Sequence, residues 1–141
     1  MATLQHGNLA LPLPAGWEDH SQLVVVGPPD GGARPNLVVT RERAPAGLTA
    51  AQAAQRALAA AKQAVPSLAV VEEDADAALG ANKGFLREQT FVDGPRGKVQ
   101  QLAFFVVKGG FLVNAVVTHS AARFDGFRSA AESLLAQLRI A

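Results

Sequence analysis

The apolar positions of this chain change their spacing several times, and each spacing predicts an element. Two runs stand out, 102–107 (LAFFVV) and 111–117 (FLVNAVV), joined by Lys108, Gly109 and Gly110. Both runs are rich in β-branched and aromatic residues, and a Gly-Gly pair supplies the positive φ of a two-residue hairpin loop. A membrane-spanning helix needs about 20 consecutive apolar residues, which the break between the runs excludes. The pattern therefore predicts a β-hairpin.

Shorter apolar runs, separated by Gly and Pro, predict further strands. Besides the hairpin, the expected strands are 3–11, 22–26, 36–42, 67–73 and 85–92. The acidic and glycine-containing stretch 74–84 between two of them is expected to be a loop. The short spacing between the turn residues favours antiparallel strands over parallel crossovers.

Two segments carry helix signals. Thr49 followed by Gln52 matches a capping box, and the alanine-rich run after it ends before Pro66. Its expected inner stripe is made of mostly small residues: Ala51, Ala54, Leu58, Ala61 and Val65. A second helix is expected within 124–138. Its expected inner residues are Phe127, Ala131, Leu134, Leu135 and Leu138. The order of elements predicts one α+β domain over residues 1–141, an antiparallel sheet with two helices packed on it.

The hairpin register divides its side chains between two faces. If Lys108 pairs with Phe111, one face is fully apolar and suits the underside of the helices: Leu102, Phe104, Val106, Val113, Ala115 and Val117. The second face is mostly apolar with a few polar residues: Gln101, Ala103, Phe105, Val107, Leu112, Asn114, Val116 and Thr118. A sheet with one wet face alternates apolar and polar residues, and this one does not. Because two small helices are not expected to cover both faces, we expect the second face to stay unoccupied within the monomer.

Two other interpretations of the second face remain open on the residues alone. Gln101 and Asn114 can bond to neighbouring backbone inside an ordinary core, or the strands can belong to a homodimer interface. Large exposed apolar patches are rare in soluble proteins, which favours these interpretations.

The composition of the chain excludes several classes of function. The net charge is +1, and the 13 basic residues are scattered rather than gathered in a stripe, so we expect no nucleic-acid partner. The absence of cysteine excludes thiol catalysis, disulfides and thiolate metal sites. The three histidines are far apart in sequence, and no P-loop, G-x-S-x-G or dinucleotide motif is present. We therefore expect no catalytic residue, no metal and no cofactor.

The first residues carry no early Lys or Arg, and Pro12 and Pro14 interrupt their apolar stretch. This is not the pattern of a signal peptide, and no Cys is available for lipidation. The sequence therefore predicts a cytoplasmic protein.

The stretch LPLPAGWEDHSQLVVV, with PNLVVTRE after it, resembles the DcrB-related family. The residues that carry the resemblance are Trp17, Asp19, Ser21, Thr40, Arg41 and Glu42. From the residues themselves, Trp17 is expected to plug the core, and Asp19 and Ser21 to brace the turn. The resemblance implies a Mog1/PsbP-like fold. One branch of the family consists of secreted lipoproteins, and the other of the cytoplasmic Eag chaperones of type VI secretion systems.

The Eag resemblance implies a function for the second face. Those chaperones are typically homodimers that hold the hydrophobic N-terminal transmembrane segment of an effector until it is loaded on the VgrG spike. Gln101 matches a glutamine of the family, and the other seven residues of the second face complete the expected client-binding surface. The family's helix glutamine falls on Ala57 here. No direct membrane insertion is expected. The alternative is a non-catalytic, Mog1-like regulatory module that binds a folded partner.

Overall fold

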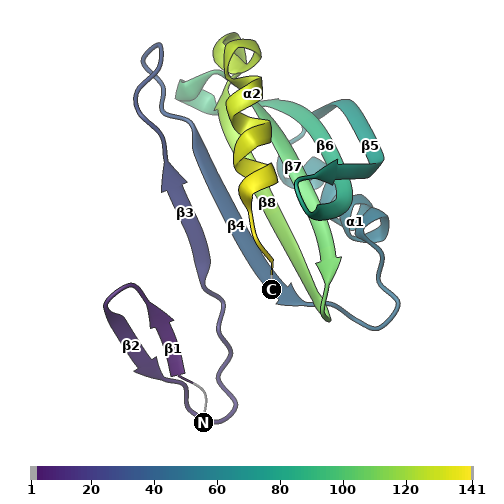
Figure 1. The fold of residues 1–141 in the computed structure, drawn as a ribbon. Coiled ribbons are helices and arrows are strands. Elements are labelled where there is room, and N and C mark those ends of the chain that lie inside the picture. Colours follow the sequence, from purple (N-terminus) through teal and green to yellow (C-terminus); the bar gives the residue numbers. More distant parts are fainter. Residues whose placement is uncertain (1–2, 141) are drawn as a thin grey trace.

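The computed structural model describes residues 3–140 and contains two helices and eight strands (Figure 1). The strands are β1 (Thr3–His6), β2 (Leu9–Pro12), β3 (Gln22–Val26), β4 (Asn36–Arg43), β5 (Ala69–Leu79), β6 (Asn82–Val92), β7 (Lys98–Lys108) and β8 (Phe111–Ser120). The helices are α1 (Ala50–Ala64) and α2 (Ala121–Gln137), and a short 3-10 helix (Gly94–Arg96) precedes β7. The predicted α+β class, two helices on an antiparallel sheet, is confirmed.

Six strands form one antiparallel sheet in the order β3-β4-β8-β7-β6-β5. β4 lies beside β8, so two strands far apart in sequence are neighbours inside the sheet, and β3 and β5 form its two edges. β1 and β2 form a separate hairpin, which we call the arm (residues 3–12). The arm projects past the end of the sheet where β3 begins (Figure 1). One strand was expected over 3–11, but a turn at Gly7, with φ of 59°, divides it.

The expected loop at 74–84 is wrong. β5 continues to Leu79 and β6 begins at Asn82, so the two strands are joined by a tight turn. β5 is an edge strand that exposes almost all of its side chains, and its register with β6 shifts twice. An edge strand can carry Asp74 and Asp76 because their side chains remain in water, so the polar composition did not reveal the strand.

The hairpin of β7 and β8 has the predicted register. Lys108 pairs with Phe111, and the loop residues Gly109 and Gly110 have φ of 60° and 80°. The register places the two predicted faces as expected. Helix α2 covers the apolar face through Phe124, Ala131 and Leu135, which are fully buried against it.

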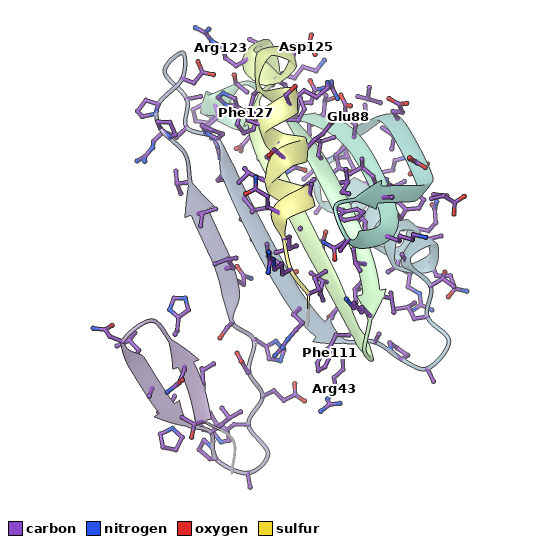
Figure 2. All side chains as sticks on the ribbon, viewed as in Figure 1. Arg43, Glu88, Phe111, Arg123, Asp125 and Phe127 are labelled. Atoms are coloured by element: carbon purple, nitrogen blue, oxygen red, sulfur yellow. The ribbon has the colours of Figure 1, made fainter. Side chains whose placement is uncertain are left out.

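An ion pair fastens the first half of α2 to the sheet. The guanidinium of Arg128 donates to both carboxylate oxygens of the buried Glu88, with 2.9 Å between Nη2 and Oε2. Gln100 also donates to Glu88, and the Arg128 guanidinium lies 5.4 Å from the centre of the Phe124 ring. Figure 2 shows Glu88 beside the upper part of α2, on the opposite side of the helix from Phe127. Arg128, with Gln100 contributing, lowers the pKa of the Glu88 carboxyl below its ordinary value.

Helix α1 begins with the predicted capping box, since Gln52 N donates to Thr49 Oγ1 and Thr49 N donates to Gln52 Oε1, both at 3.1 Å. The expectation that both helices lie on the Leu102 face is wrong. α1 packs on the opposite face, where the buried Ala53 and Ala54 contact Phe85, Ala103 and Phe105. Alanine side chains allow this because they let the helix backbone approach the sheet closely.

Arg87 anchors α1 at that position. Its side chain is 1% exposed, with Nε donating to Glu73 at 2.8 Å and Nη1 donating to the Ala54 carbonyl at 2.9 Å. The guanidinium also lies over Phe85 and Phe105, 5.3 and 5.9 Å from the ring centres. A helix with little apolar area of its own is therefore held by a buried cation that contacts both the helix backbone and the sheet.

Replacing Glu73 by Gln should destabilise the fold, because it leaves the buried Arg87 cation without a charged partner. We expect the free energy of unfolding to fall by roughly 2 kcal/mol in urea titrations. Glu72→Gln is the matched control, since it makes the same charge change at an exposed neighbour and should alter stability by less than about 0.5 kcal/mol. Equal effects from the two variants would contradict the anchoring role of Arg87.

The Glu88–Arg128 pair predicts a pH dependence. Because the pKa of Glu88 is lowered in the folded state, its contribution to stability is fully present above its ordinary pKa of about 4.3 and is lost as pH falls through the lowered value. Glu88→Gln should be less stable at neutral pH and lose less stability on acidification. Unfolding free energies of both proteins between about pH 6 and pH 3 measure this. Parallel curves would refute it.

Candidate functional site

Helix α1 covers only part of its face of the sheet. It packs on β6 and β7, while the side formed by β3, β4 and β8 keeps its side chains wholly or partly in contact with solvent. We call this surface the open half-face, and it consists of Val24, Val26, Asn36, Val38, Thr40, Leu112, Asn114 and Val116. The side chains of Val24 and Val26 are 54% and 52% exposed. The open half-face is therefore an apolar surface with a few amide and hydroxyl groups.

A hollow of about 470 Å³ lies between α1 and this surface. Its walls come from both helix and sheet and include Leu48, Arg56, Ala57, Thr40, Phe105 and Asn114. Ala57, where the resemblance implies a glutamine, thus lies at the hollow and leaves space in it. An elongated apolar ligand on the open half-face would run beside α1 and reach this hollow.

The structure brings all eight residues of the expected client-binding surface to one face. They form four cross-strand pairs: Gln101–Thr118, Ala103–Val116, Phe105–Asn114 and Val107–Leu112. Ala103 and Phe105 lie beneath α1 and are each 3% exposed, so the helix leaves almost none of their surface open to a ligand, and of the two only Phe105 lines the hollow. Leu112, Asn114 and Val116 remain partly accessible. As a client-binding surface, the set remains a prediction.

Gln101 is bonded within the protein. Its Nε2 donates to Thr118 Oγ1 at 3.0 Å, and its Oε1 accepts from Gln89 Nε2 at 2.7 Å. These three side chains form a polar row across β6, β7 and β8 on the α1 side. For Gln101, the bonding partners are therefore neighbouring side chains rather than the backbone groups considered from the sequence.

Asn114 differs from Gln101 in its bonding. Its Oδ1 is buried and has no hydrogen-bond partner among residues 3–140, although the side chain as a whole is only half-buried. A buried acceptor without a donor costs about 1–3 kcal/mol. The Oδ1 atom itself is closed to solvent, so a ligand hydroxyl can donate to it only after the Asn114 side chain turns. Asn114 is thus the polar group of the open half-face with the strongest need for a partner.

Sequence reasoning missed the part of the open half-face on β3 and β4. Val24 pairs with Val38, and Val38 pairs with Val116, so one apolar row crosses three strands. The apolar runs within 22–26 and 36–42 gave a signal for each strand. Nothing in the sequence indicated that β4 lies beside β8, and that pairing joins the row together.

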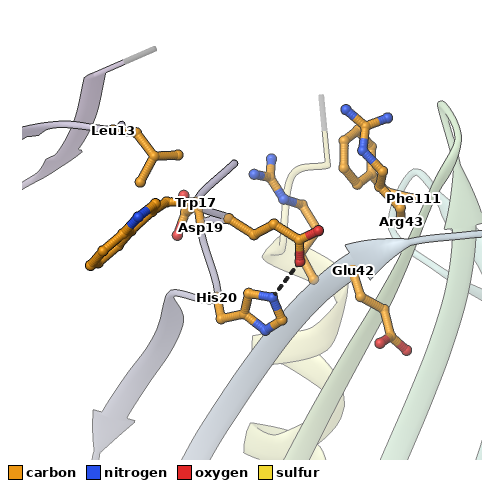
Figure 3. A pocket seen from close by; sticks show the side chains of 9 residues that line it. Leu13, Trp17, Asp19, His20, Glu42, Arg43 and Phe111 are labelled. Carbon is orange, nitrogen blue, oxygen red and sulfur yellow. Dashed lines mark hydrogen bonds and ion pairs between the residues drawn. The ribbon is translucent and has the colours of Figure 1, made fainter. Parts of the chain in front are cut away.

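A second hollow, of about 440 Å³, lies between the segment that leads into β3 and the end of β4 (Figure 3). Phe111 there carries two stacked guanidinium groups, those of Arg41 and Arg43, 4.7 and 5.6 Å from the ring centre. Glu18 Oε2 and His20 Nε2 are 2.9 Å apart on the opposite wall. Both signs of charge line the hollow, so it carries no clear preference for an anion or a cation.

Trp17 was expected to plug the core, and that expectation is wrong. The residue is 70% exposed in the segment that connects the arm to β3, and Figure 3 shows its ring pointing away from Phe111. This segment precedes the sheet and runs outside it, so the core offers no place for the indole. The expected brace is confirmed for Asp19, since its Oδ1 accepts from the backbone N–H of Ser21 at 2.8 Å.

No group of three or more His, Asp or Glu side chains among residues 3–140 could hold a metal ion. No helix in the same range is long and apolar enough to cross a membrane.

Comparison with known proteins identifies the family. The DcrB family profile matches residues 7–137, which covers the six-stranded sheet and both helices. The chain belongs to the DcrB family. No curated protein matches the DcrB-family chain in sequence.

Solved structures support the same fold for this DcrB-family chain. PA94 of Pseudomonas aeruginosa, a protein of unknown function described as a suspected regulator, aligns with a TM-score of 0.80 at 17% identity, over 100% of this chain and 97% of its own. The cyanobacterial PsbP of Synechocystis aligns at 0.61 and 12%, over 93% and 99%. LpqN of Mycobacterium tuberculosis, involved in cell envelope biogenesis, aligns at 0.54 and 14%, over 94% and 85%. At these identities the matches establish a Mog1/PsbP-like fold.

The different bonding of Gln101 and Asn114 predicts opposite effects on stability. Gln101→Leu should lower the free energy of unfolding by roughly 1–2 kcal/mol, because Gln89 and Thr118 both lose a partner. Asn114→Leu removes an unpartnered acceptor and should leave stability unchanged or raise it by up to about 1 kcal/mol. Urea unfolding of the two variants tests this, and a larger loss for Asn114→Leu would disprove it.

Proposed function

We propose that this chain is a cytoplasmic chaperone and adaptor for a type VI secretion effector. It binds the hydrophobic N-terminal transmembrane segment of the effector and shields it before loading on the VgrG spike. The observation that carries the proposal is the open half-face, an apolar surface beside α1 that bears the unpartnered Asn114 amide. Membership of the DcrB family and the resemblance of the sequence to the Eag branch support the same role.

The open half-face has the chemistry that a hydrophobic client segment needs. A segment of about 20 apolar residues aggregates or inserts into a membrane, since each buried CH₂ is worth about 0.8 kcal/mol. The valines of β3, β4 and β8 offer it an apolar surface in place of lipid. The Asn114 amide would fix the position of the client helix, because it favours a helix with a Ser or Thr hydroxyl at that depth.

The proposal includes a homodimer. One open half-face can cover only one side of a client helix, because a helix with side chains is about 10–12 Å in diameter and the surface is a single sheet layer. A second copy would contribute a second apolar surface of the same kind. The resemblance to the Eag branch implies the same assembly.

A second candidate function is a regulatory module that binds a folded partner. It is favoured by the exposed Trp17 together with Arg41, Arg43 and Phe111, since Trp and Arg are enriched among residues that dominate protein interfaces. Binding of a folded partner would depend on these residues and would tolerate changes on the open half-face. A hydrophobic client segment would show the reverse dependence.

Co-expression with the N-terminal hydrophobic segment of an effector encoded beside this gene tests the proposal. We expect wild type to keep the segment in the soluble fraction and to co-purify with it. Asn114→Leu should reduce its recovery several-fold without loss of stability, and Val38→Lys should abolish it by placing a charge on the apolar surface. Val71→Lys, at an exposed valine of β5, is the matched control and should bind as wild type does.

Recovery of the segment that is unchanged in both Asn114→Leu and Val38→Lys would count against the chaperone. Loss of partner binding in Trp17→Ala, with the open half-face variants unaffected, would instead establish the regulatory module. Circular dichroism of each purified variant separates lost binding from lost folding.

A further inference from the structure

The hollow between α1 and the open half-face, which we call the α1 hollow, has a volume of about 470 Å³. It lies at one end of the open half-face, because its sheet residues Thr40 and Leu112 stand near the end of β4 and the start of β8. A client helix that lies along these strands would therefore meet the α1 hollow near one of its ends.

Two alanines of α1 give the α1 hollow its depth. Ala53 and Ala57 are four residues apart, which places them on the same side of the helix, and both line the hollow. Ala53 packs against Phe105 of β7, which is almost fully buried and also lines the hollow. A larger side chain at position 57 would occupy the space that the two alanines leave. The glutamine that the resemblance implies at this position would do the same.

The α1 hollow is apolar at its base and polar at its mouth. Of the residues that line it, the buried ones are Ala53 and Phe105, whereas the charged ones, Glu42, Arg43 and Arg56, are all exposed. An aromatic side chain with a polar edge fits this order. A Trp or Tyr places most of its ring among apolar groups and its N–H or O–H among polar ones.

The size of the α1 hollow also favours a large side chain. Its volume of about 470 Å³ is in the range of pockets that hold whole small ligands, roughly 300–1,000 Å³. A methyl or isopropyl group would leave most of it empty. Phe105 at the base already makes an edge-on contact with Phe85, with ring centres 6.5 Å apart and planes at 70°. A client ring in the hollow would add to this aromatic cluster.

We propose that the α1 hollow binds a Trp or Tyr at one end of the client's hydrophobic segment, and that Ala57 determines this specificity. The inference rests on the proposed chaperone function. Membrane-spanning segments carry Trp and Tyr preferentially at their ends, where the ring lies at the boundary between lipid and water. The α1 hollow offers the same change from apolar to polar surroundings. The chain would thus recognise the end of a membrane segment as well as its apolar middle.

This contact would fix the register of the client. The valines of β3, β4 and β8 present a similar apolar surface to any apolar helix, so they do not set its position along the strands. A ring in the α1 hollow allows one position. Because Asn114 lines the same hollow, a client hydroxyl that meets its amide would lie close to the aromatic residue in the client sequence.

Recovery of designed segments by the full chain tests the specificity. The probes are segments of about 20 Leu and Ala residues, fused to a soluble carrier protein, with either Trp or Ala at both ends. We expect wild type to recover the Trp-ended segment roughly tenfold better than the Ala-ended one in co-expression. Ala57→Leu fills the α1 hollow, so it should lose this preference and recover the Ala-ended segment as well as wild type does.

Two further variants make the comparison specific. Ala57→Gln fills the α1 hollow with a different side chain and should also lose the preference, so the result does not depend on one variant. Ala59→Leu is the matched control. It makes the same change at an exposed position about half a turn away on α1, and it should keep the preference.

Disulfide formation tests the position of the client. Because the chain has no cysteine, Ala57→Cys introduces a single thiol. It should form a disulfide with a Cys at the end of the designed segment and none with a Cys at its middle. Ala59→Cys should form neither.

The outcomes separate the inference from the function on which it rests. Equal recovery of the two segments by wild type, or a preference that survives both changes of Ala57, overturns the inference and leaves the chaperone function intact. A wild type that retains neither segment overturns both.

Discussion

The Arg87 side chain holds α1 on the sheet, and the surface chemistry of the molecule depends on where it does so. Its guanidinium donates to the Ala54 carbonyl and to Glu73 and lies over the rings of Phe85 and Phe105. A helix of mostly alanine cannot fix its position by apolar burial alone. Because the anchor stands on β6, the helix covers β6 and β7, and the part of the same face on β3, β4 and β8 stays open.

The two faces of the sheet are therefore covered differently. α2 seals its face with Phe124, Ala131 and Leu135, and the Arg128–Glu88 pair closes one end. On the α1 side, polar groups fall into two kinds. Gln101 is bonded to its neighbours and contributes to the fold, whereas the Asn114 oxygen is buried without a partner. A polar atom that costs stability is more informative about ligand binding than one that the protein already satisfies.

The two edges of the sheet also differ in what they expose. β5 is protected by carboxylates and irregular register, while β3 has a regular register with β4, carries no charge and is apolar on both sides. The arm adds exposed leucines at the end of the molecule where β3 begins. The open half-face adjoins this edge, because Val24 and Val26 of β3 belong to it.

The sequence alone determined the elements that depend on local interactions. Neighbouring residues determine the capping box at Thr49, the glycine turn after Lys108 and the hairpin register. The α+β class and the two faces of β7 and β8 follow from these features. Only the tertiary structure decided that β4 lies beside β8, that α1 lies on the second face and that Trp17 lies outside the core. Each of these depends on contacts between residues far apart in the chain, which periodicity and spacing do not report. The tertiary structure also showed that the Asn114 side-chain oxygen lacks a hydrogen-bond partner, because this is seen only when the surroundings of the amide are known.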